Sequence, residues 1–268
     1  MSKLGFIGAG NMAAAIINGI VTANAMDAAD IIASDTDKNR LIYFAENYRV
    51  KITQSNTELS QKADIIFLSV KPDVYDSVIE EIKGHLSPNA LIVILAAGLS
   101  LNMVKEKFGT DSIKLIKTMP NTPSVVNSGM TAICACENVT PDEIEKIQSI
   151  FNIIGKTEIL PEKLFDAFTG ISGSSPAYAL MFIEAMADAG VKHGLSRAQA
   201  IKISAQSLYG AAKMALETGE HPATLKDAIC SPGGTTIAAV CELERQGFRN
   251  AVICGVNAAV ERYNEMGV

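Results

Sequence analysis

The segment that most constrains the fold of this chain is KLGFIGAGNMAAAI, at residues 3–16. Gly8, Gly10 and Ala13 stand at the spacing G-x-G-x-x-A, between a β-like run and an apolar helical pattern. The spacing allows a tight turn, close approach of the backbone to a pyrophosphate and close helix-to-strand packing, where Ala replaces the third Gly. A pyrophosphate would lie on the helix N-terminus. The segment therefore predicts a dinucleotide-binding unit.

The rest of the first 160 residues repeats the same alternation of strand and helix. Short apolar runs, LGFIG, DIIAS, ADIIFLSV, ALIVILAA and IKLIKTM, are separated by helical patterns. Continuous apolar strands indicate a parallel sheet covered on both faces. After Pro161 only helices are expected, at residues 176–193, 197–217, 235–245 and 249–266. We predict an α/β, Rossmann-like doubly wound domain at residues 1–160 and an all-helical domain at residues 161–268.

Composition narrows the classes of partner. A net charge of −6 without any Lys/Arg run argues against nucleic acid and against an anionic membrane surface. The first strand begins at Lys3, which leaves no room for an export signal, so a cytoplasmic protein is expected. The five cysteines include no CxxC pair and no His at ligand spacing, so no metal site is predicted. Cys134 and Cys136 are expected to be buried in a strand.

The helix expected at residues 176–193 predicts an assembly. Its charged side chains before the last turn are Glu184 and Asp188, which form one narrow stripe. A small helical domain has few ways to surround a helix that is apolar on all other sides. We therefore expect a second subunit to cover it, with a homodimer as the minimum assembly.

The end of the second predicted strand bears on the choice of cofactor. Asp35 lies 22 residues after Ala13 (35 − 13), close to where an acidic residue binds a ribose 2′-OH, which favours NAD. Ser34, Lys38 or Arg40 could instead hold a 2′-phosphate, which leaves NADP open. Lys38 and Arg40 are equally well explained as solvated charges.

Further cofactor contacts are expected where the other strands end, because open α/β sheets bind ligands outside the carboxyl ends of their strands. Lys71 follows one such strand, and Asn121, in MPNTPS, follows another near the expected nicotinamide position. Pro72 has the alternative role of starting a helix. The full set of predicted cofactor residues is Phe6, Ile7, Gly8, Ala9, Gly10, Asn11, Met12, Ser34, Asp35, Asn56, Ser69, Val70, Lys71, Pro72, Ala96, Ala97 and Asn121.

A second polar, Gly-rich stretch, SPGGTT at residues 231–236, stands just before a predicted helix. The backbone N–H groups around Gly233 and Gly234 suit a carboxylate. The hydroxyls of Thr235 and Thr236 can cap the helix, or one of them can bind a substrate nitrogen. A helix N-cap without any catalytic role is the plainer explanation of this stretch taken alone.

In order along the chain, GFIGAGNM, VKP, AAG, MPNTP, SGSSPAY, LETGEHPATLKD and SPGGTT resemble the pyrroline-5-carboxylate reductases. LKDAICSPGGTT is the family-specific part, whereas GxGxxA marks any dinucleotide binder. The resemblance implies reduction of Δ1-pyrroline-5-carboxylate to L-proline by a nicotinamide cofactor, NADPH or NADH, as the last step of proline biosynthesis. It also implies a substrate-binding helical domain that interlocks in dimers, which in some members assemble into decamers.

The resemblance also assigns roles to residues. It implies that the backbone around Gly233, Gly234 and Thr235, with Ser231, holds the substrate carboxylate, and that the Thr236 hydroxyl lies near the ring nitrogen. Glu162 and Ser175 carry over as substrate-binding residues. Asp35 departs from the family, since members that prefer NADP often have a neutral residue there.

Two rival functions remain. A β-hydroxyacid dehydrogenase would need a catalytic Lys on the first long helix of the second domain, which has none before Lys192. A silent dinucleotide sensor would need no SPGGTT loop. His85, His193 and His221 are scattered, so a His general acid is not expected. His193 resembles a helix C-terminal residue, and His221 is either a structural cap or part of a pocket wall.

Overall fold

The computed structural model describes residues 3–95 and 98–266. These residues form two compact units, which are described separately. The first unit holds the residues up to Gly173 together with those from Val260 onwards, and the second runs from Ser174 to Ala259. Residues 161–173, placed in the helical domain by the sequence analysis, lie in the first unit. They are held there because Phe165 is fully buried with Met119 and Ala132.

The first unit is built on one sheet of eight strands in the order β3-β2-β1-β4-β5-β6-β7-β8. Neighbouring strands run parallel except β6 and β7, which are antiparallel. The sequence analysis expected a parallel sheet, but only a short 3-10 helix joins these two strands, too short for a crossover. The strands are β1 (Leu4–Ile7), β2 (Ile31–Ser34), β3 (Lys51–Thr53), β4 (Ile65–Leu68), β5 (Leu91–Ile94), β6 (Lys114–Pro120), β7 (Gly129–Ala135) and β8 (Gly155–Ile159).

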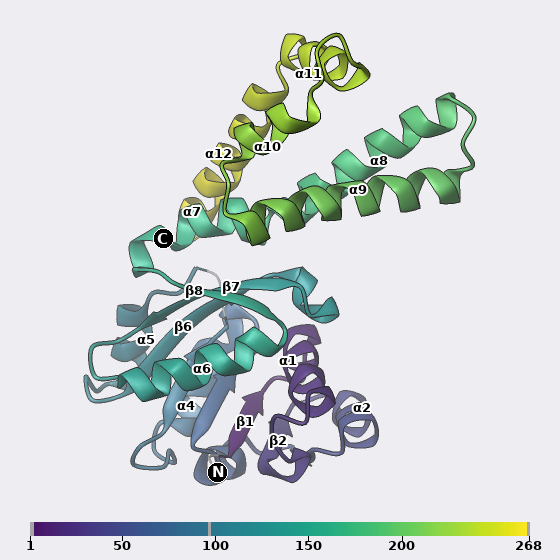
Figure 1. The fold of residues 1–268 in the computed structure, drawn as a ribbon. Helices are drawn as coiled ribbons and strands as arrows, with labels where there is room; N and C mark the ends of the chain where they lie inside the picture. Colours follow the sequence, from purple (N-terminus) through teal and green to yellow (C-terminus); the bar gives the residue numbers. More distant parts are fainter. Residues whose placement is uncertain (1–2, 96–97, 267–268) are drawn as a thin grey trace. The chain divides into compact units, whose positions relative to one another are not determined.

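Helices cover both faces of this sheet (Figure 1). On one face α1 packs against α2 and α6, and on the other α4 packs against α3 and α5. The central strands are fully buried because helices cover them on both sides, which explains their unbroken apolar runs. The helices are α1 (Asn11–Thr22), α2 (Lys38–Tyr48), α3 (Asn56–Lys62), α4 (Tyr75–Ile82), α5 (Leu101–Phe108), α6 (Pro141–Ile153) and α7 (Phe165–Phe168). The expected doubly wound fold is confirmed.

Short turns link these elements. The 3-10 helices are η1 (Ala28–Asp30), η2 (Pro72–Val74), η3 (Thr122–Val126) and η4 (Glu162–Leu164), and η5 (Thr169–Gly173) is a π-helical turn. From β1 the chain first adds β2 and β3 on one side and then β4 and the later strands on the other, so the order of strands reverses between the parallel neighbours β1 and β4. The carboxyl ends of these two strands form the topological switch point at which such folds bind ligands.

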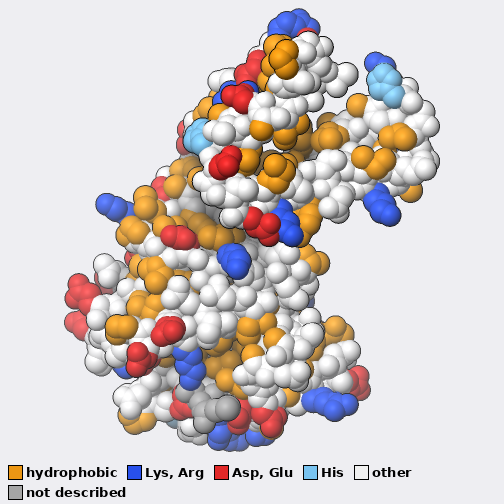
Figure 2. Space-filling model, in the orientation of Figure 1, with side chains coloured by type: hydrophobic (Ala, Val, Ile, Leu, Met, Phe, Trp, Pro, Cys, Tyr) orange, Lys and Arg blue, Asp and Glu red, His pale blue; other side chains and the backbone are white. Residues whose placement is uncertain are grey.

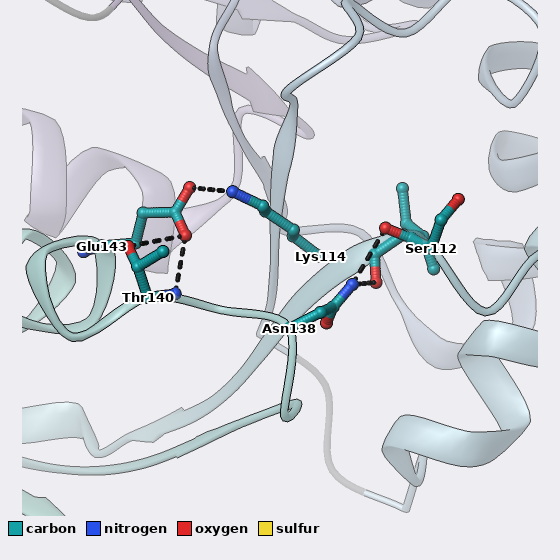
Figure 3. A network of polar contacts seen from close by, with 6 residues as sticks. Ser112, Lys114, Asn138, Thr140 and Glu143 are labelled. Carbon is teal, nitrogen blue, oxygen red and sulfur yellow. Dashed lines mark hydrogen bonds and ion pairs between the residues drawn. The ribbon is translucent and has the colours of Figure 1, made fainter.

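A polar network fixes the start of α6 to the edge of β6 (Figure 3). Thr140 and Glu143 form a capping box, in which each side chain accepts the other residue's backbone N–H. The ammonium of Lys114 lies 2.7 Å from the Glu143 carboxylate. The amide of Asn138 donates to the carbonyl of Ser112 at 2.9 Å. Although partial burial opposes it, donation from Lys114 and Thr140 lowers the pKa of Glu143.

The second unit is all helical, as expected. It contains α8 (Ser175–Lys192), α9 (Arg197–Thr218), α10 (Pro222–Ile229), α11 (Thr235–Arg245) and most of α12 (Phe248–Met266). The expected helix bounds agree with α11 and differ by one residue at one or both ends of α8, α9 and α12; α10 was not expected. His193 is the C-cap of α8 and Gly194 follows with φ of +96°, which supports the structural interpretation of His193.

Helices α8 and α9 of this unit lie side by side as a hairpin (Figure 1). They leave apolar side chains exposed. Leu180 and Met181 on α8 are 65% and 67% exposed, and Leu216 on α9 is 84% exposed. Hydrophobic side chains are visible on the surface of this hairpin (Figure 2). The apolar face expected from the sequence is therefore uncovered within a single chain. Within the described residues, no helix combines the length and the hydropathy that a membrane crossing requires.

Candidate functional site

The loop after β1 has the geometry that a bound pyrophosphate requires. Gly8 has φ of +100°, and a Cβ there would lie 2.7 Å from the carbonyl oxygen of Ser69. Its N–H donates to the carbonyl of Ser34 at 2.8 Å, and the Ser69 hydroxyl lies 2.8 Å from its carbonyl oxygen. Gly8 thus joins the carboxyl ends of β1, β2 and β4. No side chain other than hydrogen fits this position.

The N-terminus of α1 is open. Gly10 is its N-cap, with no side chain capping the helix and no acidic residue in the first turn. A Cβ at Gly10 would lie no closer than 3.8 Å to the neighbouring atoms, so the space beside it is free for a ligand. The first backbone N–H groups of a helix have no partner within the helix and favour an anion. The residues present therefore fit a dinucleotide pyrophosphate.

Asp35, just after β2, is fixed against this loop. One carboxylate oxygen accepts the Ala9 N–H at 2.7 Å and the other accepts the Asp37 N–H at 2.8 Å. The Arg40 guanidinium lies 3.4 Å from the Ala9 carbonyl oxygen. Next to these contacts is a hollow of about 330 Å³, lined by Ala9, Gly10, Asn11, Asn39, Arg40, Tyr43 and Phe44.

Several predicted cofactor residues have side chains that are buried or already hydrogen-bonded within the protein. Phe6 and Ile7 belong to the core, and the ring of Phe6 stacks on Phe67 with 4.6 Å between centroids. Ser34 is fully buried and donates to the amide oxygen of Asn56 at 2.7 Å. The Asn56 amide nitrogen donates to Glu81 at 2.8 Å. Phe6, Ile7 and Ser34 therefore shape the backbone of the loop rather than present a side chain to solvent.

The loop after β4 presents the exposed Lys71, which is the N-cap of η2, between the half-buried Val70 and the exposed Pro72. Tyr75, which the sequence analysis missed, lies fully buried beneath this loop. Its hydroxyl donates to the Leu68 carbonyl at 2.6 Å and accepts the Leu95 N–H at 3.2 Å, and burial raises its pKa. It fixes the spacing of the β4 and β5 ends. The predicted residues Ala96 and Ala97 lie outside the described residues.

Asn121 has a structural task in this chain. Its amide oxygen accepts the Met130 N–H at 2.8 Å, and its amide nitrogen donates to the Ser172 carbonyl at 3.0 Å. It ties the end of β6 to β7 and to η5. The prolines of MPNTPS explain the short η3, since Pro123 stands in its first turn.

Glu162 pairs with Lys117, a residue that the sequence analysis did not single out. The Lys117 ammonium is 3.0 Å from Glu162 Oε1 and 4.9 Å from the centroid of the Phe165 ring. The same carboxylate oxygen accepts the Leu101 N–H at the start of α5. Because the Lys117 side chain is only 5% exposed, loss of Glu162 would leave a buried ammonium without its carboxylate partner. The second Lys of the otherwise apolar strand IKLIKTM was the available sequence clue.

The SPGGTT loop lies in the second unit and opens α11. Gly233 has φ of +68°, and the Gly234 N–H donates to the Ser231 carbonyl at 3.0 Å. Gly234 is the N-cap, and the first turn of α11 has neither a side-chain cap nor an acidic residue. Neither Thr235 nor Thr236 caps the helix, so its first N–H groups are available to an anion.

Thr236 lines a hollow of about 260 Å³ within the second unit. Most of its wall is apolar, with Met214, Leu225 and Ile229 from α9 and α10. His221 is the N-cap of α10, and its Nδ1 accepts the Ala223 N–H at 3.2 Å. Of the two explanations left open for His221, the structure supports the cap. Ser175, half-buried, is the first residue of α8.

The comparisons with known proteins cover the whole chain. A family model for the pyrroline-5-carboxylate reductase dimerisation domain matches residues 162–266, and one for coenzyme F420-dependent NADP oxidoreductases matches residues 3–98. The pyrroline-5-carboxylate reductase of Escherichia coli K12 is 43% identical, with 98% of each chain covered. The human pyrroline-5-carboxylate reductase 2 is 39% identical, covering 98% of this chain and 83% of its own.

Solved structures agree with these relatives. The pyrroline-5-carboxylate reductase of Coxiella burnetii superposes with a TM-score of 0.94 at 34% identity, covering 100% of this chain and 99% of its own. The pyrroline carboxylate reductase of Plasmodium falciparum, solved with NADP bound, gives a TM-score of 0.88 at 36% identity, covering 100% and 98%.

Proposed function

The chain belongs to the pyrroline-5-carboxylate reductase family, and from this premise we propose how its residues reduce Δ1-pyrroline-5-carboxylate to L-proline with NAD(P)H. This reaction is the last step of proline biosynthesis. The observation that carries the proposal is the uncapped N-terminus of α11 behind the turn at Gly233 and Gly234. It offers backbone N–H groups to a substrate carboxylate. The hydroxyl of Thr236 lies in the same first turn, which contains no acidic residue.

The first unit binds the cofactor. The N–H groups at the start of α1, from Asn11 and Met12, hold the pyrophosphate, while Gly8 and Gly10 keep the backbone accessible. Lys71 and the β4 loop form a further wall, and Asp35 meets the adenosine ribose. When bound, the nicotinamide supplies the hydride for the imine carbon. Asn121 and Ser69 contribute to cofactor binding indirectly, because their side chains hold the backbone of Met130 and Gly8 in place.

The second unit binds the substrate. The N–H groups of Gly233, Gly234 and Thr235 receive the carboxylate, and the helix dipole of α11 favours its negative charge. The hydroxyl of Thr236 is held toward the ring nitrogen and helps to protonate it, with water as the final source of the proton. Ser231 shapes the turn, and Ser175 contributes at the start of α8. The apolar wall beside Thr236 suits the methylene groups of a pyrroline ring.

Glu162 acts in this proposal as a positioning residue. Its carboxylate is already bound by Lys117 and by the Leu101 N–H, so its effect on the substrate is indirect. The functional division of the chain places cofactor binding at residues 1–160 and substrate binding with dimerisation at residues 161–268.

The assembly and location of the protein complete the proposal. The match to a dimerisation domain and the exposed apolar face of α8 and α9 support a homo-oligomer, and we take a homodimer as its unit. From membership of the same family we also predict further assembly into decamers and a cytoplasmic location. Light scattering after gel filtration distinguishes the dimer from a decamer.

The activity test follows the absorbance of the reduced nicotinamide with Δ1-pyrroline-5-carboxylate as substrate and detects proline as product. Thr236→Ala should lower kcat/KM about a hundredfold, the low end of what a proton donor contributes, and leave cofactor binding unchanged. Thr236→Ser, which keeps the hydroxyl, should retain most activity. Thr224→Ala, on the exposed side of neighbouring α10, is the matched control. Equal kinetics for Thr236→Ala and wild type would remove Thr236 from the mechanism.

A further inference from the structure

Residues 35–40, DTDKNR, lie against the phosphate loop through Asp35 and Arg40. This segment carries no net charge, because it has two acidic and two basic residues. What distinguishes NADH from NADPH must therefore come from how the four charges are placed. Of these groups, the Asp35 carboxylate is the one fixed at the loop itself, since both of its oxygens accept backbone N–H groups, from Ala9 and from Asp37. A charge held in this way cannot turn away from a ligand without breaking those bonds.

The basic side chains of the segment are placed less firmly. The Arg40 side chain is 53% exposed, and its Nε lies 3.9 Å from the Asp37 carboxylate, which offsets part of its charge. Its contact with the Ala9 carbonyl oxygen is long, at 3.4 Å. Lys38 is exposed at the first position of α2. An exposed cation of this kind contributes little free energy to binding a partner in water.

The remaining candidate for a 2′-phosphate, the hydroxyl of Ser34, is not presented to a ligand. Ser34 is fully buried and its hydroxyl donates to Asn56. The amide of Asn56 is in turn bound to Glu81, which adds a further carboxylate rather than a cation. The Ser34 hydroxyl is therefore already used as a donor within the protein, and Glu81 adds negative charge beside it.

We infer that Asp35 makes NADH the preferred cofactor of this protein. A ribose 2′-hydroxyl donates a hydrogen bond that the fixed carboxylate accepts, whereas a 2′-phosphate brings about two negative charges and no donor. Each carboxylate oxygen keeps a lone pair after accepting one backbone N–H. The pyrophosphate is common to NADH and NADPH, so the repulsion that distinguishes the two cofactors acts on the 2′-phosphate alone. The inference rests on the proposed placement of the dinucleotide in the first unit.

Isothermal titration of the whole protein with NADH and with NADPH, without substrate, measures this preference apart from turnover. We expect the Kd for NADPH to exceed that for NADH by about tenfold or more, the ratio that one unfavourable charge contact at a partly exposed site produces. Asp35→Asn removes the charge but keeps an acceptor for one backbone N–H. It should bring the two Kd values together or reverse their order, mainly by tightening NADPH.

The control is Glu46→Gln, which makes the same change of net charge at an exposed position of α2. It should leave the ratio close to that of the wild type. Tighter binding of NADPH than NADH by the wild type, or equal Kd values, would overturn the inference. If the wild type prefers NADPH and Arg40→Ala loses that preference, Arg40 rather than Asp35 selects the cofactor. Failure of both cofactors to bind would instead refute the proposed cofactor site, while binding of both without turnover would refute the proposed reaction alone.

Discussion

Single residues in this protein are constrained for different physical reasons even within one motif. Gly8 is required by the protein itself, because its φ of +100° and the nearby Ser69 carbonyl exclude any Cβ. Gly10, two residues on, has an ordinary φ of −80° and room beside it, so its need for a small side chain arises only when a ligand binds. Substitution of Gly8 should therefore lower the stability of the protein, whereas substitution of Gly10 should weaken cofactor binding.

Gly10→Val tests this separation. We expect Kd for both NADH and NADPH to rise at least about tenfold, because the branched side chain occupies the space of the pyrophosphate. The melting temperature should remain close to that of the wild type. Gly8→Ala should instead lower the free energy of unfolding by about 1–3 kcal/mol through backbone strain. Thermal unfolding and titration of both variants check the pair, and unchanged cofactor affinity in Gly10→Val would contradict the placement of the phosphate loop.

Between elements, polar groups hold the sheet and its helices in register. The Lys117–Glu162 pair joins β6 to the start of α5, the Tyr75 hydroxyl bridges the ends of β4 and β5, and the network around Glu143 fixes α6 to β6 (Figure 3). Each contact has at least one partner at the end of an element, where backbone groups lack partners within their own helix or strand. Of these, the Glu143 network is far from the candidate site and can be altered without touching it.

Glu143→Gln should lower the free energy of unfolding at pH 7 by about 1 kcal/mol, since Gln keeps the capping box but loses the ion pair with Lys114. The pKa of Glu143 is lowered in the folded state, so the ionised carboxylate stabilises the protein above its ordinary pKa of 4.5, and this contribution is lost as the pH falls through the folded-state value. Denaturant titrations should show the difference between wild type and variant shrinking below about pH 4.5.

The control for this series is Glu145→Gln, an exposed position on the same helix. It should change stability little at any pH. A difference for Glu143→Gln that stays constant down to pH 3 would mean that the charge of Glu143 does not contribute.

At the scale of the whole molecule, the helical unit is incomplete in a single chain. Ala187 is the buried residue of α8 among those the structure describes, although the helix is apolar over most of its surface. Covering side chains such as Leu180 and Met181 stabilises an assembly by about 1.5–3 kcal/mol each. The exposed face is therefore expected to be the contact between subunits.

The double variant Leu180→Glu and Met181→Glu should shift the protein from dimer to monomer at micromolar concentration, because burying two new charges opposes association. Light scattering after gel filtration measures the mass. Ile42→Glu, at an exposed apolar position of α2 in the first unit, is the matched control and should remain a dimer. A dimer that persists in the double variant would place the interface elsewhere.

The sequence by itself determined the strand and helix alternation, the phosphate loop and the family, because these depend on local spacing and apolar periodicity. The short exposed strands β3 and β8 and helix α10 were missed, since their apolar pattern is weak, and the antiparallel direction of β7 was not expected. Only the tertiary structure brought Glu162 to Lys117 and fixed Asp35 against Ala9, contacts between residues 45 and 26 positions apart. Local patterns carry no information on such pairs, because packing of the whole sheet decides which side chains meet.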